Sequence, residues 1–226
     1  TGWWKVRNSQ VIFDNDVCGN QSGWWKITNG RVDFDFTGLA ENAYGWWKIT
    51  NGQVDFGYVG YEQNGSNWWY VYGGQVCFQA TDVLPGTVGG QYGWWKVCEG
   101  KVNFDDDVCE NAYGWWKITT GKVDFQYTGL AQNVCGWWMI QNGHVNFGSN
   151  GLVDNGNGWW LVRNGCVDFN YNGLVDNGNG WWLIRNGCVD FNYDGLVDNG
   201  NGWWLVKNGC VDFSYQGYVQ NECGVW

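Results

Sequence analysis

The residues best suited to chemistry in this sequence are tryptophans, which recur as adjacent pairs. The 226-residue chain contains 21 Trp. A flat indole can stack on the apolar face of a sugar ring while neighbouring Lys, Asp, Asn and Gln side chains bond the sugar hydroxyls. The same ring can hold a quaternary ammonium group by cation–π attraction, worth about 0.5–2 kcal/mol per ring. The pattern therefore indicates ligand binding through aromatic surfaces.

Catalytic chemistry has little support in the sequence. His144 is the single histidine, no nucleophile-elbow motif is present, and the carboxylates recur in every copy of a repeat rather than forming one unique site. We therefore predict that the protein is not an enzyme and needs no cofactor.

The nine cysteines favour disulfides over metal binding. None of them forms a C-x-x-C arrangement, so no metal site is expected. Disulfides formed in an oxidising exterior are the better interpretation, and Cys98 and Cys109 are close enough in sequence to bridge within one copy. Because the count is odd, at least one thiol is expected to stay free or to join another chain.

The charge balance excludes several partners. The net charge is −10, with 12 Lys and Arg against 22 Asp and Glu. Nucleic acid is not an expected partner, because its binding requires a basic footprint that displaces counterions. Membrane insertion is not expected either, since no apolar run approaches the roughly 18 residues of a membrane span.

The Trp pairs mark an internal repeat of about 22 residues. Consecutive pairs are 21, 22 or 26 residues apart, and a partial eleventh copy ends at Trp226. The ten pairs begin at Trp3, Trp24, Trp46, Trp68, Trp94, Trp115, Trp137, Trp159, Trp181 and Trp203.

Each copy is predicted to form a β-hairpin. In the third copy, the first strand runs over Trp46–Thr50 and the second over Gln53–Tyr58. Asn51-Gly52 between them is the strongest short hairpin signal, because a type I′ turn needs positive φ at both central residues. A Gly-containing turn and a short polar loop are expected to lead to the next Trp pair.

A two-residue turn fixes the register and separates the two indoles. Trp47 should lie on an apolar face with Ile49, Val54, Phe56 and Tyr58. Trp46 should lie on the other face, beside an ion pair between Lys48 and Asp55 that recurs as Lys26–Asp33 and Lys117–Asp124. The first Trp of each pair is then the reachable one. Two alternatives stay open: both Trp rows are core, or the first Trp is partly buried and its edge lines a groove between copies.

A lone hairpin is marginal in water, so the copies must bury their apolar faces against one another. We predict an all-β fold in which tandem hairpins stack into an elongated β-solenoid. The insertion at 80–91, with Pro85, is the best site for a bend or boundary. It suggests repeat blocks at 1–93 and 94–226, the second including the terminal partial copy, although one continuous solenoid is the alternative.

The Gly-Trp-Trp start, the Asn-Gly turn and the aromatic second strand resemble the cell-wall-binding repeats of Gram-positive surface proteins. These repeats are of the choline-binding and glucan-binding type, and the pattern NG-x-VDF-x-Y-x-GL followed by GWW looks like the clostridial form. The resemblance covers nearly the whole chain. It implies a β-hairpin solenoid with ligand sites formed by aromatic residues of adjacent hairpins. The family's second-strand Trp-Tyr-Tyr is Val-Asp-Phe-x-Tyr in this chain.

We predict multivalent binding of cell-wall or extracellular carbohydrate by an array that is secreted or attached to the cell surface. A structural stalk, or a subunit of an extracellular fibre assembled by head-to-tail stacking or through the odd cysteine, is the alternative. The candidate ligand-binding residues are Trp24, Trp46, Trp68, Trp94, Trp115, Trp137, Trp159, Trp181, Trp203, Tyr58, Tyr127, Tyr171 and Tyr193.

Overall fold

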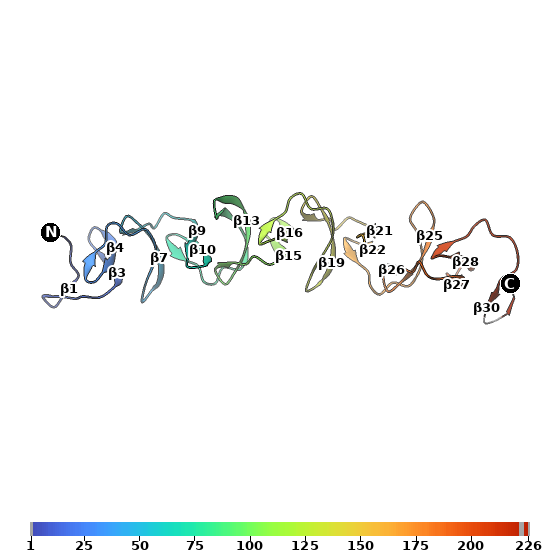
Figure 1. The fold of residues 1–226 in the computed structure, drawn as a ribbon, viewed down its shortest axis with the longest axis horizontal. Helices are drawn as coiled ribbons and strands as arrows, with labels where there is room; N and C mark the ends of the chain where they lie inside the picture. The colour runs from blue at the N-terminus through green and yellow to red at the C-terminus, as the bar shows by residue number, and fades with distance from the viewer. Residues whose placement is uncertain (1, 222–223, 226) are drawn as a thin grey trace. The chain divides into compact units, whose positions relative to one another are not determined.

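The computed structural model describes residues 2–221 and 224–225, which form tandem β-hairpins (Figure 1). The predicted all-β fold built from hairpin repeats of about 22 residues is confirmed. Trp226, the end of the predicted partial copy, lies outside the described residues. Within the described part of the chain, no helix is long and apolar enough to cross a membrane.

Each regular repeat contributes three strands. The strands that carry the Trp pairs are β4 (Gly23–Thr28), β7 (Gly45–Thr50), β10 (Asn67–Tyr72), β13 (Gln91–Cys98), β16 (Gly114–Thr119), β19 (Gly136–Gln141), β22 (Trp159–Arg163), β25 (Trp181–Arg185) and β28 (Trp203–Lys207). The two-residue strands after the turns are β2 (Gln10–Val11), β5 (Arg31–Val32), β8 (Gln53–Val54), β11 (Gln75–Val76), β14 (Lys101–Val102), β17 (Lys122–Val123), β20 (His144–Val145), β23 (Cys166–Val167), β26 (Cys188–Val189) and β29 (Cys210–Val211).

The third kind of strand precedes each Trp strand. These strands are β3 (Asp16–Asn20), β6 (Gly38–Asn42), β9 (Gly60–Asn64), β12 (Asp82–Val88), β15 (Asp107–Asn111), β18 (Gly129–Asn133), β21 (Gly151–Asp154), β24 (Gly173–Asp176) and β27 (Gly195–Asp198). The remaining strands are β1 (Val6–Arg7), β30 (Gln220–Asn221) and β31 (Gly224–Val225).

The Asn-Gly turn has the predicted geometry and register. Asn51 and Gly52 have φ values of 50° and 79°. Ile49 pairs with Val54, and Thr50 pairs with Gln53. The turn therefore determines which side chains of the two strands face each other, as a two-residue loop does.

Two predictions about the rest of the repeat were wrong. The second strand ends at Val54, because the Asp55 carboxylate accepts a hydrogen bond from the Gly57 backbone N–H at 3.1 Å and turns the chain. The segment before the next Trp pair is not a polar loop. It forms strand β9, whose residues pair with β10 from Gly60–Val71 to Asn64–Asn67.

Neighbouring repeats are joined through their backbones. The Lys48 N–H donates to the Gly74 carbonyl of the following repeat at 2.8 Å. Gly52 packs directly against the preceding repeat, because a Cβ added to Gly52 would lie only 2.5 Å from the Asp33 carbonyl oxygen. The hairpin turn of one repeat therefore rests on the second turn of the repeat before it.

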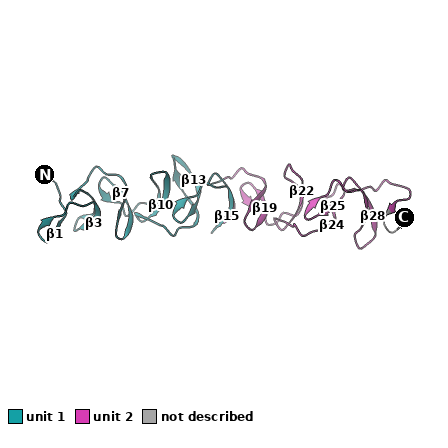
Figure 2. Cartoon of the chain, turned by 60° about the horizontal axis from the view of Figure 1, so that its bottom comes forward, with its two compact units in different colours: residues 1–113, 118–123 teal, residues 114–117, 124–226 magenta. Residues whose placement is uncertain are grey.

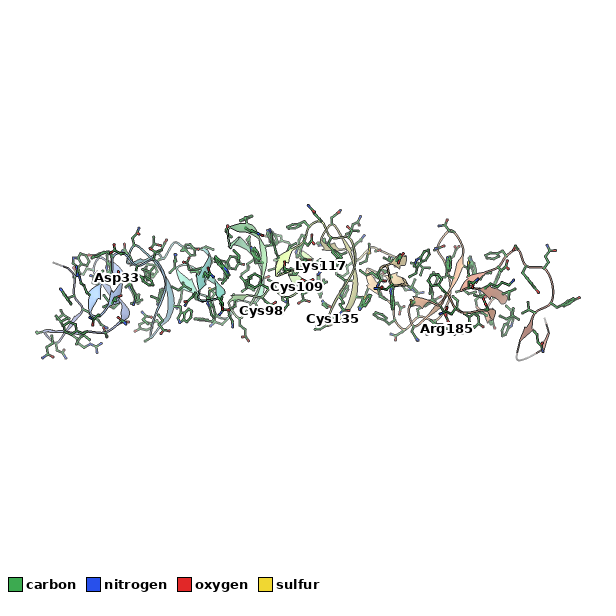
Figure 3. The ribbon with its side chains drawn as sticks, viewed as in Figure 1. Asp33, Cys98, Cys109, Lys117, Cys135 and Arg185 are labelled. Atoms are coloured by element: carbon green, nitrogen blue, oxygen red, sulfur yellow. The ribbon has the colours of Figure 1, made fainter. Side chains whose placement is uncertain are left out.

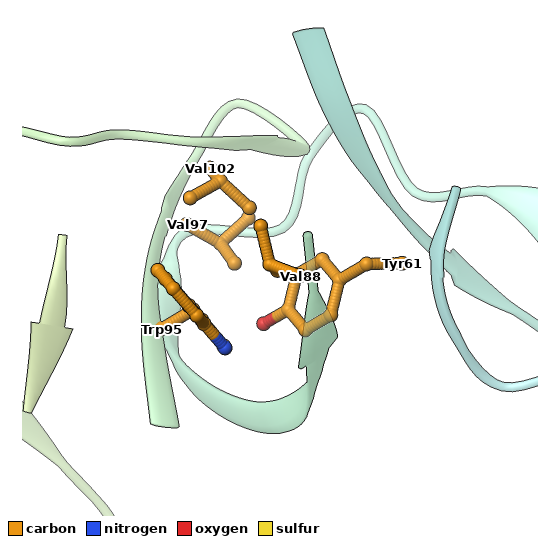
Figure 4. Packing of buried hydrophobic residues seen from close by; sticks show 5 residues of the cluster. All are labelled: Tyr61, Val88, Trp95, Val97 and Val102. Carbon is orange, nitrogen blue, oxygen red and sulfur yellow. The ribbon is translucent and has the colours of Figure 1, made fainter. Parts of the chain in front are cut away.

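Small apolar cores form between successive repeats. Ile49 and Val162, which follow the Trp pairs of their strands, have no exposed surface. Figure 4 shows one such core, made by Tyr61, Val88, Trp95, Val97 and Val102. Because each core is built from adjacent repeats, no single hairpin has to be stable by itself.

The insertion near Pro85 lengthens a hairpin. Strands β12 and β13 pair over seven residue pairs, from Asp82–Val97 to Val88–Gln91, around a Gly89-Gly90 turn. The chain divides into two compact units (Figure 2). One comprises residues 1–113 and 118–123, and the other comprises 114–117 and 124–226. The blocks 1–93 and 94–226 stay a prediction.

Candidate functional site

The two indoles of a Trp pair pack against different neighbours. Trp46 contacts Trp69 of the following repeat, with ring centroids 5.2 Å apart. Trp47 contacts Trp24 of the preceding repeat, at 5.4 Å. Adjacent strand residues point to opposite sides, so one pair can join its repeat to both neighbours.

A phenylalanine completes each of these contacts. Phe56 lies edge-on to Trp24 at 6.3 Å and to Trp47 at 5.8 Å. We call the first Trp of one repeat, together with the second Trp and the Phe of the next, an aromatic cluster. Seven such clusters are seen in the described residues: Trp3–Trp25–Phe34, Trp24–Trp47–Phe56, Trp46–Trp69–Phe78, Trp115–Trp138–Phe147, Trp137–Trp160–Phe169, Trp159–Trp182–Phe191 and Trp181–Trp204–Phe213.

The aromatic clusters are partly open to solvent. Phe56 is 49% exposed, which corrects its predicted place on a buried apolar face. It leaves that face because the strand has ended at Val54. The indoles of Trp24 and Trp47 are half-buried. Phe is not among the residues predicted for the site, although a Phe recurs two residues after the Val of each short strand that follows a hairpin turn, as in Val54 and Phe56. That recurrence is a signal in the sequence.

Grooves adjoin the first Trp of several repeats. Trp24 lines a groove with Asn20, Asn42 and Tyr44. An open groove of about 460 Å³ beside Trp159 is lined by Asp154, Asp176, Asn150, Asn177 and Asn179. Carboxylates and amides beside an indole can bond hydroxyl groups while the ring provides an apolar surface. This geometry corresponds to the predicted alternative in which the first Trp is partly buried and its edge lines a groove.

Three further predicted Trp residues have contacts or exposure of their own. Trp68 packs against the core group that contains Trp95. Trp94 contacts Tyr113 with centroids 5.4 Å apart. Trp203 is 49% exposed. Six of the nine predicted tryptophans are seen in the seven aromatic clusters named above for the described part of the chain. Their ligand-binding role stays a prediction.

The predicted tyrosines are not among the rings that define the aromatic clusters. Their hydroxyl groups and rings contact other residues of the chain. The Tyr58 hydroxyl donates to the Tyr61 carbonyl at 2.8 Å, and Lys48 Nζ lies 5.3 Å from the Tyr58 ring centroid. The same hydroxyl bond recurs at Tyr127, Tyr171 and Tyr193. Arg185, labelled in Figure 3, covers the ring of Tyr193 at 4.5 Å. Hydroxyl and ring face are thus both used to hold the repeat together.

The predicted cross-strand ion pairs are wrong for two of the three. Lys48 is only 6% exposed and its ammonium group pairs with Glu62 at 2.8 Å. Lys26 donates to the Ile27 carbonyl at 2.9 Å, whereas Asp33 accepts from the Thr28 hydroxyl at 3.0 Å. The Lys side chains point toward the interior, whereas each Asp follows the end of the short strand, where the chain turns away from the Lys. For the third predicted pair, the ammonium of Lys117 lies 5.6 Å from the Tyr127 ring centroid.

All eight cysteines in the described residues are free, so the predicted disulfides are not formed among them. Cys98, Cys109 and Cys135 are labelled in Figure 3. The Cys109 thiol donates to Asp107 at 3.3 Å, and burial, followed by the charge of Asp107, raises the pKa of Cys109 to about 12. This thiol is therefore neutral at pH 7, and it is hydrogen-bonded to a carboxylate instead of being bonded to another cysteine.

Comparison with known proteins agrees with this arrangement of repeats. The family model described as choline-binding repeat matches residues 35–55, 126–146, 148–168, 170–190 and 192–212. No curated protein matches the chain. Five segments thus match the choline-binding repeat model, and the predicted resemblance to the choline-binding, cell-wall-binding repeat family is confirmed.

Solved structures of one protein are similar to the chain. Choline binding protein F from Streptococcus pneumoniae, in crystal form II, is 18% identical with a TM-score of 0.36, over 100% of this chain and 75% of that one. The same protein in the presence of a peptidoglycan analogue is 16% identical with a TM-score of 0.36, over 90% and 75%. A structure of a protein named CbpF, in complex with ipratropium, is 17% identical with a TM-score of 0.37, over 97% of this chain and 79% of that one.

Proposed function

We propose that this chain is a non-catalytic, multivalent array outside the cell that binds cell-wall polysaccharide carrying cationic substituents such as choline. The observation that carries the proposal is the aromatic cluster, which recurs with a nearly constant distance between its indoles. Its two indoles are 5.2–5.4 Å apart wherever all three rings are seen.

A cationic group suits this cluster. Indole and phenyl faces attract cations, and quaternary ammonium groups are commonly held by several aromatic rings. The rings are half-buried, so part of the hydration that competes for the cation is removed. The net charge of −10 also attracts a cationic polymer.

A polysaccharide suits the surfaces around the clusters. The groove beside Trp159 offers the carboxylates of Asp154 and Asp176 and three asparagine amides to hydroxyl groups. Each site is shallow and therefore weak. A polymer that engages many sites is held with an avidity roughly 10²–10⁴ times the affinity of one site.

The test is a titration of the full chain, labelled with ¹⁵N, with choline chloride and separately with choline-free wall polysaccharide. We expect choline to shift the indole N–H signals of Trp24 and Trp47. Phe56→Ala should weaken the response of Trp24 and Trp47, because Phe56 contacts both rings. Tyr72→Ala is the matched control, since Tyr72 is 63% exposed and belongs to no cluster.

The outcomes separate the two ligand chemistries. If only the choline-free polysaccharide gives a response, the ligand is a neutral glycan, and recognition of a cationic substituent is excluded. No response to either, together with long polymers in light scattering, would reject binding in favour of the stalk or fibre.

A further inference from the structure

The residue directly after each hairpin turn lies opposite the second Trp of the preceding repeat. Gln53 pairs with Trp25, Gln75 with Trp47, Lys101 with Trp69 and Lys122 with Trp95. Directly opposed residues of an antiparallel pair share one face of the sheet. We call this position the flanking residue, because it borders the second indole of a Trp pair.

In copies that begin Gly-Trp-Trp, the flanking side chain lies over that glycine; the pair that Lys101 flanks is preceded by Asn67 instead. A Cβ at Gly45 would be 2.8 Å from the Gln75 amide nitrogen, and one at Gly158 would be 3.2 Å from Cys188 Sγ. The glycine thus leaves room for the flanking residue. Its identity varies along the chain, in contrast to the constant Trp pair. After Gln53 and Gln75 it is Lys101, Lys122, His144, Cys166, Cys188 and Cys210.

Glutamine and cysteine leave the indole without a charge beside it. Gln75 donates its amide N–H to the Tyr44 carbonyl at 2.8 Å, and Gln53 donates to the Ser22 carbonyl at 3.3 Å. Cys188 and Cys210 donate weakly to the carbonyls of Val189 and Val211. Burial raises the pKa of both thiols, so they are neutral at pH 7.

The two flanking lysines place a charge on the aromatic surface itself. Lys101 Nζ lies 5.5 Å from the Trp69 ring centroid, and Lys122 Nζ lies 5.8 Å from that of Trp95. Both distances are within the range of a cation–π contact. The electron-rich faces are therefore engaged by the protein's own ammonium groups.

We propose that the flanking residue decides which aromatic surfaces accept a cationic ligand. Those flanked by Gln or Cys accept one, whereas that of Trp69 is closed by Lys101. Trp95, beside Lys122, is buried in a core and only 5% exposed, so it offers no such surface. This inference rests on the proposed function, since it assigns a charge preference to individual sites of the same array. A second cation beside the lysine would be repelled, which weakens binding there on the order of tenfold.

The experiment follows the indole N–H signals of individual tryptophans while choline chloride is added to the ¹⁵N-labelled full chain. In the wild type, Trp47 should respond and Trp69 should not. Lys101→Gln should open the Trp69 site with roughly tenfold tighter apparent affinity. Gln75→Lys should close the Trp47 site by a similar factor. Lys101→Arg keeps the charge and should leave Trp69 unresponsive.

The results distinguish the inference from the function on which it rests. If the wild type binds choline and the Lys101 and Gln75 exchanges change nothing, the flanking residue has no such role and the proposed function stands. If neither the wild type nor any variant binds choline, both fall. Lys101 is exposed, so its exchange for Gln is not expected to disturb the fold. The reciprocal variant Gln75→Lys tests the inference independently.

Discussion

Aromatic residues of one repeat differ in what their rings and polar atoms contact. The Tyr193 hydroxyl donates to the Leu196 carbonyl at 2.9 Å, and its ring lies beneath Arg185. Phe191, which has no polar atom, is 40% exposed and contacts the indoles of Trp159 and Trp182. The tyrosine therefore stabilises its own repeat, and the phenylalanine is the better candidate for contact with a ligand.

Exchange of Tyr193 for Phe should lower stability without altering ligand binding. The variant loses one hydrogen bond to a backbone carbonyl, which corresponds to about 1 kcal/mol of unfolding free energy. Urea unfolding measures the loss, and the choline titration measures binding. Phe191→Ala is the counterpart, with weaker binding expected at Trp159 and Trp182. A clear loss of choline binding in Tyr193→Phe would restore the tyrosine to the site.

The Lys96–Asp107 pair predicts a dependence of stability on pH. The Asp107 carboxylate accepts from Lys96 Nζ at 2.6 Å and from the Val108 N–H at 2.8 Å. Partial burial acts to raise the pKa of Asp107, but these hydrogen bonds, with that of Lys96 the largest, lower the pKa below its ordinary value of 3.8. The unfolded chain then binds the proton more readily. The stabilisation is present above about pH 4 and is lost as the pH falls through the lowered pKa.

Asp107→Asn tests this dependence. At pH 7 the variant should be less stable by about 1.5 kcal/mol, the lower end for a hydrogen bond to a charged group, because the carboxylate is partly exposed. Between pH 4 and pH 2 its stability should fall less steeply than that of the wild type. Urea unfolding across this range provides both values, and parallel curves would contradict the assignment.

At the scale of the strands, one interior position is filled in two ways. In the third repeat it is Lys48, paired with Glu62 of strand β9. In a later repeat the corresponding residues are Leu161, which is 3% exposed, and Val175, which packs in the same apolar core. The change from Lys to Leu along the chain therefore does not alter which face is buried. A buried ion pair has been replaced by an apolar contact.

The apolar pair of the later repeat can be introduced into the third repeat by mutation. Lys48→Leu alone leaves Glu62, whose side chain is 22% exposed, without its ammonium partner, and should cost about 3 kcal/mol at most. Addition of Glu62→Val should recover the loss and can exceed wild-type stability. Denaturant unfolding of the two singles and the double gives the coupling free energy. Additive effects of the two substitutions would show that the pair is not coupled.

The hairpin turn could be predicted from the sequence, but the strand that precedes each Trp pair could not. Asn51-Gly52 determines its own geometry locally, so the register to Val54 was confirmed. The Gly38–Asn42 segment has no strand-like alternation, and it becomes a strand through pairing with β7. The prediction for Phe56 is wrong because the alternation of a strand does not continue past the turn at Asp55. The aromatic cluster depends on contacts between repeats, which a single hairpin does not contain.

Two glycines with nearly identical φ allow a test of how turns join the repeats. Gly52 has φ 79° and Gly90 has φ 78°. A Cβ at Gly52 would lie 2.7 Å from Phe34 Cα, whereas a Cβ at Gly90 has no neighbour within 4 Å. Gly90→Ala should cost about 1–2 kcal/mol for the left-handed backbone alone. Gly52→Ala should cost more, because the backbone of the preceding repeat must shift. Equal losses in thermal or urea unfolding would contradict this contact.

For the molecule as a whole, the proposed function implies that the number of clusters matters more for binding than the affinity of any one. A ligand at one exposed cluster gains only the contacts of three rings, each worth about 0.5–2 kcal/mol. A polymer bound at one cluster is presented to the others at high effective concentration, so its release requires several sites to be empty together. Free choline and polymeric wall should therefore respond differently to the loss of sites.

Cumulative removal of clusters provides the measurement. Phe56→Ala, Phe169→Ala and Phe191→Ala each remove the exposed ring of one cluster. In the triple variant, free choline should bind the intact clusters with unchanged affinity. Retention on immobilised wall polysaccharide should fall far more than in proportion to the sites lost, toward the roughly 10²–10⁴-fold range of avidity. The matched control combines Tyr72→Ala, Tyr92→Ala and Tyr218→Ala, three exposed aromatic residues outside the clusters, and should be retained like the wild type. A loss of retention that merely tracks the number of clusters would mean that they act one at a time, and the repetition of the hairpin would then require another explanation.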